Sequence, residues 1–121
     1  MRTNEFTVFP VTMKISNQDI DKIIEIALDE GSCLSWCYNI ESMYSETVPV
    51  SRVISTGGIL LFYCMDRVYT LSKVKIIQGL QQALPYLAKF VNEDTLDLSS
   101  INSDDADFII QLALFNELLF D

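Results

Sequence analysis

The apolar residues near the start of the chain first follow a strand-like pattern and then a helical one. Residues 6–15 are rich in β-branched and aromatic types and predict a strand, which Pro10 either confines to a sheet edge or splits. Ser16 is the expected helix N-cap, with Asp19 three residues later as in a capping box. A helix follows, and Gly31 predicts its end. Its apolar positions, at helical spacing, are Ile20, Ile23, Ile24, Ala27 and Leu28.

The middle of the chain has a less regular pattern. Residues 32–52 include Trp36 and are compatible with either a strand or a short helix. Gly57-Gly58 predicts a turn or bulge, because the continuous apolar run over 59–64 that follows is typical of a central strand. Residues 68–71 are expected to pair back on that run as a hairpin.

The second half of the chain predicts two more helices. Ser72 is the expected N-cap of the first, and Pro85 should kink it or end it early. One helical stripe is expected to hold Val74, Ile77, Leu80, Leu84, Leu87 and Val91. Residues 92–102 hold three acids and several small polar residues and predict a loop, after which Ser103 should cap the last helix.

The last helix carries two apolar stripes with few polar residues between them. One stripe holds Ala106, Ile109, Ile110 and Ala113, and the other holds Phe108, Leu112, Phe115 and Leu119. A helix apolar on nearly all sides is usually buried on both. It either lies centrally between the sheet and the preceding helix, or offers its second stripe to another chain, most simply a second copy across a two-fold axis.

The order of the elements predicts the fold class. A strand, a helix, the undetermined segment, a hairpin and two helices indicate an α+β fold, with a small antiparallel sheet and about three helices packed on one face. The length of 121 residues fits a single domain over 1–121.

The charge balance points to the kind of partner. The chain has 17 Asp plus Glu against 8 Lys plus Arg, a net charge of −9, which opposes direct binding of nucleic acid or anionic membrane. The acids gather in 19–30 and 93–107, whereas 67–89 holds four bases and no acid. These acidic runs are either solvated helix faces or a face that imitates nucleic-acid phosphates and docks on a basic surface. The candidate partner-binding acids are Asp94, Asp97, Asp104, Asp105 and Asp107.

Several residue types and motifs are absent from the chain, which limits the kinds of catalytic and metal site it can form. The chain has no histidine, which excludes Ser-His-Asp and Cys-His catalysis and histidine-ligated zinc. Its three cysteines match neither a CxxC redox pair nor a thiolate metal site, so we expect free thiols, no metal, no cofactor and no enzymatic activity. The acids at the start of the last helix are explained by its dipole, and the alternative is a Mg²⁺ or Ca²⁺ site at Asp104, Asp105 and Asp107, whose spacing matches no calcium loop. No signal peptide or membrane-length apolar run is found, which predicts a reducing cytoplasm.

Aromatic residues add further candidates for partner binding. Trp36 and Tyr38 lie in the undetermined segment, and clustered aromatics of this kind are found at interfaces and in cores alike. The second stripe of the last helix, with Phe108, Leu112 and Phe115, is the candidate surface for a homodimer.

Several short stretches together resemble a small family of proteins carried by bacterial phages and prophages. These are DIDKIIEIALDEG followed by Trp36-Cys37, then ISTGGILLFY, LSKVKIIQGLQQAL and DADFIIQLALF, within residues 19–118. The family pattern has ALEGG, YWC, GG and QYALFG in this order. The chain departs from it at Asp29-Glu30-Gly31 and at Asn116, which replaces the final glycine. No activity or site residue follows from this resemblance.

The resemblance implies a biological context. Small acidic phage proteins are often accessory factors, and some inhibit host defence complexes such as CRISPR effectors. Our first hypothesis is therefore a non-enzymatic protein that binds and inhibits a defence protein or nucleoprotein in the host cytoplasm. The alternative is a homo-oligomer that sequesters a small nucleotide-like ligand, for which the nearest phosphate partners are Arg52, Arg67, Lys73 and Lys75.

Overall fold

The fold begins with a β-hairpin followed by a helix. The computed structural model describes residues 4–8, 11–29, 36–43, 47–65 and 67–119. Strands β1 (Asn4–Val8) and β2 (Val11–Ile15) pair antiparallel, so the strand predicted over 6–15 is split in two, which is one of the two outcomes expected there. Pro10 itself lies outside the described residues.

The capping box predicted for the first helix is confirmed. Helix α1 spans Asn17–Leu28. The Asp19 N–H donates to Ser16 Oγ at 3.0 Å, and the Ser16 N–H donates to an Asp19 carboxylate oxygen at 3.0 Å. The predicted apolar face of α1 is buried, except that Leu28 is only partly covered. Gly31 lies outside the described residues.

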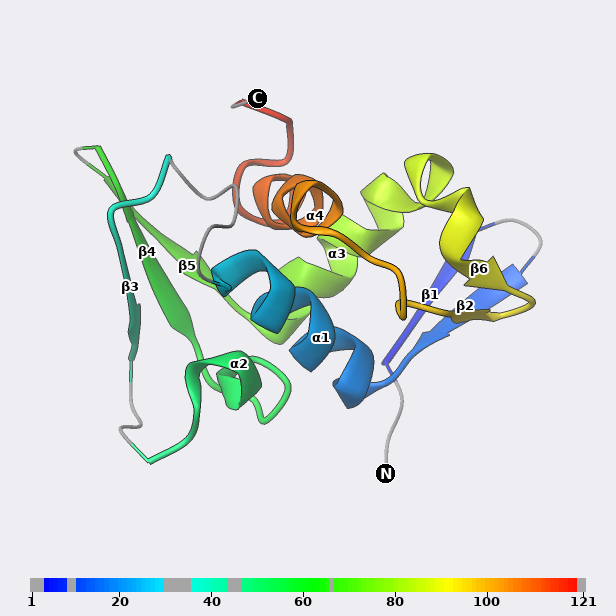
Figure 1. Ribbon diagram of the computed structural model, residues 1–121, viewed down its shortest axis with the longest axis horizontal. Coiled ribbons are helices and arrows are strands. Elements are labelled where there is room, and N and C mark those ends of the chain that lie inside the picture. The colour runs from blue at the N-terminus through cyan, green and yellow to red at the C-terminus, as the bar shows by residue number, and fades with distance from the viewer. Residues whose placement is uncertain (1–3, 9–10, 30–35, 44–46, 66, 120–121) are drawn as a thin grey trace.

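The largest sheet has one covered face and one uncovered face. Its strands are β3 (Asn39–Ser42), β4 (Leu60–Cys64) and β5 (Arg67–Leu71), antiparallel in the order β3-β4-β5. Along β4, Leu60, Phe62 and Cys64 are buried, whereas Leu61 and Tyr63 are half-buried. Helices α1, α3 and α4 lie on the same side of this sheet (Figure 1), which confirms the predicted α+β architecture.

The segment over 32–52 contains both of the elements considered for it. Strand β3 comes first, and the short helix α2 (Val50–Val53) follows. Gly57 has φ of +95°, and the Gly58 N–H donates to the Val53 carbonyl at 2.8 Å, which fits the turn predicted before β4.

Helix α3 (Lys73–Ala83) ends before Pro85, as predicted, and two 3-10 turns, Leu84–Tyr86 and Ala88–Phe90, follow. The predicted stripe was partly wrong, since Val74 is 66% exposed and Val91 is also exposed. The buried face of α3 holds Ile76, Gly79, Leu80 and Ala83. Val74 precedes Pro85 and lies off this buried face, whereas Val91 was included because the stripe was extended past Pro85, where the helix has ended.

The loop predicted over 92–102 contains part of a small hairpin. Strands β6 (Val91–Asn92) and β7 (Thr95–Leu96) pair antiparallel. The Lys14 N–H donates to the Asp94 carbonyl at 2.7 Å, which joins this hairpin to β2. The loop expectation missed three core residues, Leu96, Leu98 and Ile101, because they are isolated among polar neighbours.

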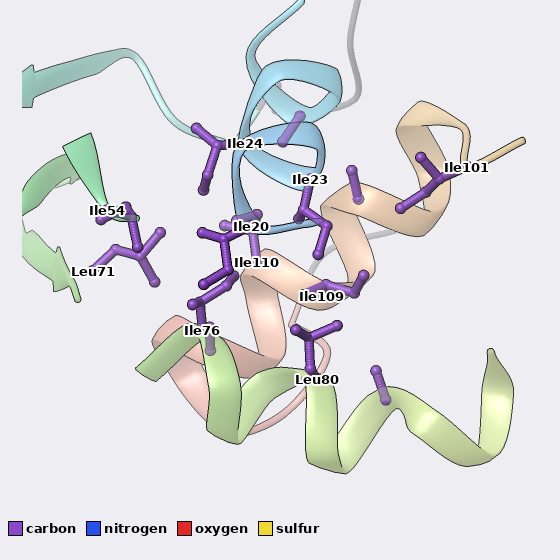
Figure 2. Close-up of a cluster of buried hydrophobic side chains, with 14 of the residues drawn as sticks. Ile20, Ile23, Ile24, Ile54, Leu71, Ile76, Leu80, Ile101, Ile109 and Ile110 are labelled. Carbon is purple, nitrogen blue, oxygen red and sulfur yellow. The ribbon is translucent and has the colours of Figure 1, made fainter. Parts of the chain in front are cut away.

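Helix α4 (Ser103–Phe115) is the central helix of the fold. Its N-cap is Asn102 rather than Ser103, and its capping box is completed by Asp105. Figure 2 shows Ile109 and Ile110 of α4 facing Ile20 and Ile23 of α1 on one side, with side chains of α3 on another. The helix ends at Asn116, whose φ is +64°, so Leu119 lies beyond it.

Candidate interaction surfaces

The acidic residues predicted to bind a partner do not form one exposed group. Asp94 lies in the turn between β6 and β7, and its Oδ2 is 3.5 Å from Lys14 Nζ. Asp97 follows β7, and Asp104 is exposed in the first turn of α4. The Lys14–Asp94 pair is exposed to solvent and contributes little stability, so Asp94 remains available as a surface charge.

Asp105 has a structural role. Its carboxylate accepts a hydrogen bond from the Asn102 N–H at 3.3 Å, and its own N–H donates to Asn102 Oδ1 at 2.8 Å. Its Oδ1 is also 3.8 Å from Lys89 Nζ, and its side chain is only 16% exposed. Asp105 therefore caps α4 and carries part of a local ion pair.

Asp97 is held as a charged surface residue. Its Oδ1 accepts a hydrogen bond from the Ser99 N–H at 3.1 Å. Hydrogen bonds from Ser99 lower the pKa of Asp97 below the usual value, since they favour the ionised carboxylate. The negative charge at this position is consequently retained well below neutral pH.

Asp107 is buried, so its prediction as part of an acidic face was wrong. The residue is 5% exposed, and its Oδ1 accepts a hydrogen bond from Trp36 Nε1 at 2.7 Å. Loss of solvent raises the pKa of Asp107 above its usual value, and the hydrogen bonds from Trp36 and Gln111 oppose this rise. The error arose because every first-turn acid was taken to face solvent.

Three linked hydrogen bonds form a network around this buried carboxylate. Gln111 is fully buried, and its Nε2 donates to Asp107 Oδ2 at 3.1 Å. The Leu119 N–H in turn donates to Gln111 Oε1 at 3.0 Å. The network joins Trp36, α4 and the segment after α4, with each donor facing an acceptor.

Trp36 is a core residue and was wrongly considered a candidate surface residue. It is 9% exposed, and its ring stacks on Phe62 with 6.3 Å between centroids. The edge of Phe115 meets the same indole at 5.4 Å. Because α4 and the sheet cover both the ring and its N–H, Trp36 has no surface left for a partner.

The second stripe of α4 is largely covered by the chain itself. Phe108, Leu112 and Phe115 are partly buried and pack against the core. Phe115 also contacts Tyr69 at 4.7 Å between centroids, and Phe108 contacts Tyr86 at 5.4 Å. These contacts use much of the surface that the homodimer hypothesis assigned to another copy.

Tyr38 lies on the surface, as its prediction as a partner-binding residue requires. Its side chain is 70% exposed, and its ring centroid is 6.1 Å from that of Tyr63. A hydrogen bond between Tyr63 and the Glu41 carboxylate is the largest cause of the raised pKa of Tyr63. Tyr63 and Glu41 were missed, although the alternation within 59–64 places Tyr63 on the opposite face from Phe62.

The four bases considered for a phosphate ligand do not surround one hollow. A shallow hollow of about 250 Å³ is lined by Glu5, Lys73, Val74, Ile77 and Gln78. Arg52 instead lies 3.9 Å from Asp21, and Lys75 Nζ donates to the Thr70 carbonyl at 2.7 Å. Lys73 is therefore the one base of the four that lines this hollow.

The described cysteines are free thiols. Cys64 is buried, and burial, followed by the neighbouring Cys37, raises the pKa of its thiol to about 12. Cys33 lies outside the described residues. Within the described part of the chain, no three acids or cysteines gather in a way that would hold a metal ion.

Among the residues that the structure describes, no helix is long and apolar enough to cross a bilayer.

The motifs behind the phage-family resemblance are dispersed over the fold. Trp36-Cys37 precedes β3, Gly57-Gly58 precedes β4, and the DADFIIQLALF stretch forms most of α4. The core positions of Trp36 and α4 and the turn at Gly57-Gly58 give these motifs structural roles that need no shared function, so the resemblance stays a prediction. Comparison of the chain with protein-family models, with curated proteins and with solved structures gave no match.

Proposed function

We propose that this protein is a non-enzymatic binding module that occupies a basic surface of another protein. One observation supports the proposal above all: the chain has 17 acids and 8 bases. Even if every base were paired with an acid of the same chain, nine carboxylates would lack a basic partner. An excess of this size favours fast association with a positively charged surface.

The contact residues we assign are those that remain at the surface. Asp94, Asp97 and Asp104 occupy the β6–β7 hairpin, the loop after it and the start of α4, and Tyr38 lies at the three-stranded sheet. We no longer assign partner contact to three of the predicted residues: Asp105 caps α4, and Asp107 and Trp36 belong to the core.

The partner we favour is a host defence nucleoprotein, such as a CRISPR effector complex. Such complexes hold nucleic acid in positively charged channels, and an acidic protein lodged there would exclude the nucleic acid. This choice of partner rests on the phage-family resemblance, whereas the preference for a basic surface rests on the charge of the chain.

A binding assay with purified CRISPR effector complexes tests the proposal. We expect stoichiometric binding that survives nuclease treatment and that weakens about tenfold or more when Asp94, Asp97 and Asp104 are all replaced by Lys. The matched control replaces Glu25, Asp29 and Glu117, which are exposed elsewhere, by Lys. Equal losses in both triple variants would show that only net charge matters. Unchanged binding in the first variant would refute the assigned surface.

Nucleotide sequestration by a homo-oligomer has less support. The bases that would bind phosphate are dispersed, and the stripe proposed for the dimer packs largely within the chain. Phosphate groups would also be repelled by the net charge of −9.

A further inference from the structure

We infer that the uncovered face of the three-stranded sheet is a second contact surface, at which Tyr38, Tyr63 and Glu41 receive an Arg or Lys side chain from a basic segment of the partner. This inference rests on the proposed function and adds to it a recognition site remote in sequence from the acids at 94–104.

The strand register brings the residues of this surface together. Glu41 pairs with Leu61, and Asn39 pairs with Tyr63, which in turn pairs with Val68. Cross-strand partners share a face, so these five side chains lie on the face opposite to buried Phe62. Val68 is 52% exposed, and Leu61 and Tyr63 are half-buried. The surface is therefore apolar in the middle, with one carboxylate beside it.

The described elements leave this face open. Helices α1, α3 and α4 all lie on the other side of the sheet (Figure 1). Tyr38 adds a ring that is 70% exposed and inclined by 53° to the ring of Tyr63. Two inclined rings whose centroids are 6.1 Å apart provide aromatic surface that a further side chain can cover.

The chemistry of the three side chains selects a cation. An ammonium or guanidinium group over a tyrosine ring is attracted by the π electrons, and an adjacent carboxylate strengthens this attraction. The hydrogen bond between Glu41 and the Tyr63 side chain shows that the carboxylate lies beside this tyrosine. A guanidinium is the better fit, since it is planar and can stack on a ring while donating to the carboxylate.

The nearest bases belong to the other edge of the sheet, at β5 and the start of α3. Lys75 Nζ is held by the Thr70 carbonyl at 2.7 Å and by Thr70 Oγ1 at 3.1 Å, at the position that pairs with Leu61. Arg67 pairs with Cys64, so the alternation of β5 directs its Cβ to the opposite face from Val68. Because Leu61 also pairs with Glu41, the Glu41 carboxylate and the Lys75 ammonium lie at opposite edges of the sheet, and the β3 edge is the acidic one.

A titration followed by NMR tests the inference. The probe is a short peptide of alternating Arg and Ser, and the comparison peptide has citrulline in place of every Arg. We expect the Arg peptide to shift the amide signals of β3 and β4, and the citrulline peptide to leave them in place. Shifts confined to residues around Asp97 and Asp104, or equal shifts with both peptides, would overturn the inference.

Two variants measure the contribution of the surface. Tyr38→Ala and Glu41→Gln are each expected to weaken the peptide affinity about threefold to tenfold. The matched control is Tyr86→Ala, a tyrosine that is 74% exposed on the 3-10 turn after α3. An equal effect of Tyr38→Ala and Tyr86→Ala would contradict a specific site.

The same variants separate this inference from the proposed function. If the CRISPR effector complex binds Tyr38→Ala and Glu41→Gln normally but loses affinity for the triple Lys variant at 94, 97 and 104, the inference fails and the proposed function stands. If the effector complex does not bind wild-type protein while the Arg peptide still shifts β3 and β4, the choice of partner fails and the surface stands.

Discussion

At the scale of single residues, the most consequential wrong prediction was the exposure of Asp107, which is buried. A buried carboxylate is costly unless hydrogen bonds compensate for lost water. Here Trp36 and Gln111 each donate to a different oxygen, at 2.7 and 3.1 Å. The Trp36 indole N–H and the buried Gln111 amide both donate to Asp107, so the three residues depend on one another.

Replacement of Asp107 by Ala is expected to lower the free energy of unfolding by about 2–4 kcal/mol, because two buried donors lose their acceptor. Urea denaturation followed by tryptophan fluorescence measures the change at Trp36 directly. The matched control is Asp104→Ala in the exposed first turn of the same helix, with an expected loss of about 1 kcal/mol or less. Equal losses in the two variants would contradict the role assigned to the network.

The pH dependence of stability follows from the raised pKa of Asp107. The folded protein keeps the proton to a higher pH than the unfolded chain, so this residue favours folding fully below the unfolded pKa of about 4 and less as pH rises through the folded pKa. Relative to an Asp107→Asn variant, wild-type protein should therefore lose stability as pH rises from about 4 towards neutrality. An unchanged difference between the two proteins across this range would contradict the raised pKa.

At the scale of elements, the contact between α3 and α4 depends on a glycine. A Cβ atom at Gly79 of α3 would lie 2.9 Å from the Ala113 Cβ, 2.9 Å from the Ala113 nitrogen and 2.9 Å from the Ile109 carbonyl oxygen. Two of these atoms belong to the backbone of α4, which cannot yield as a side chain can. The helices therefore pack together at a distance that only glycine allows.

Gly79→Ala should destabilise the protein by roughly 1–3 kcal/mol, although alanine favours a helix more than glycine does. The reason is that α3 and α4 must separate to admit the methyl group. Thermal unfolding measures the loss, and Gln81→Ala on the exposed face of α3 provides the control, with little expected change. Stabilisation by Gly79→Ala would mean that the helix contact is looser than described.

The elements that the sequence predicted well are the long ones. Helix α1 has enough residues for a period to be recognised, and local capping fixes where it begins. The β4–β5 hairpin was recognised from the continuous apolar run that forms β4. Strand β3, helix α2 and the β6–β7 hairpin have two to four residues per element, which is too short for a periodic signal. Their conformations are determined by tertiary contacts and not by a periodic pattern in the local sequence.

The candidate site was harder to predict than the fold. Exposure of Tyr38 and burial of Trp36, two positions apart, both follow from how the segment before β3 meets β4 and α4. In the same way, Asp104 is exposed and Asp107 is buried, although they lie within one turn of α4. A single sequence shows which side chains can bind a partner, whereas tertiary packing decides which of them reach the surface.

At the scale of the whole molecule, the excess negative charge destabilises the compact folded state. Repulsion among the acids weakens in salt, so added sodium chloride should raise the melting temperature by about 2–5 °C. The variant with Lys at positions 25, 29 and 117 has a net charge of −3 instead of −9 and should show a smaller rise. A melting temperature that falls with salt in wild-type protein would indicate that ion pairs outweigh the repulsion.

The central position of α4 also determines when the protein can fold during its synthesis. Trp36 and Asp107 are 71 positions apart, a stretch that takes a ribosome roughly 4–14 s to translate. Until α4 leaves the ribosome, the apolar faces of α1 and α3 have no helix between them to bury against. These faces therefore stay exposed on the nascent chain during that time, and chaperones that bind apolar segments can bind them then.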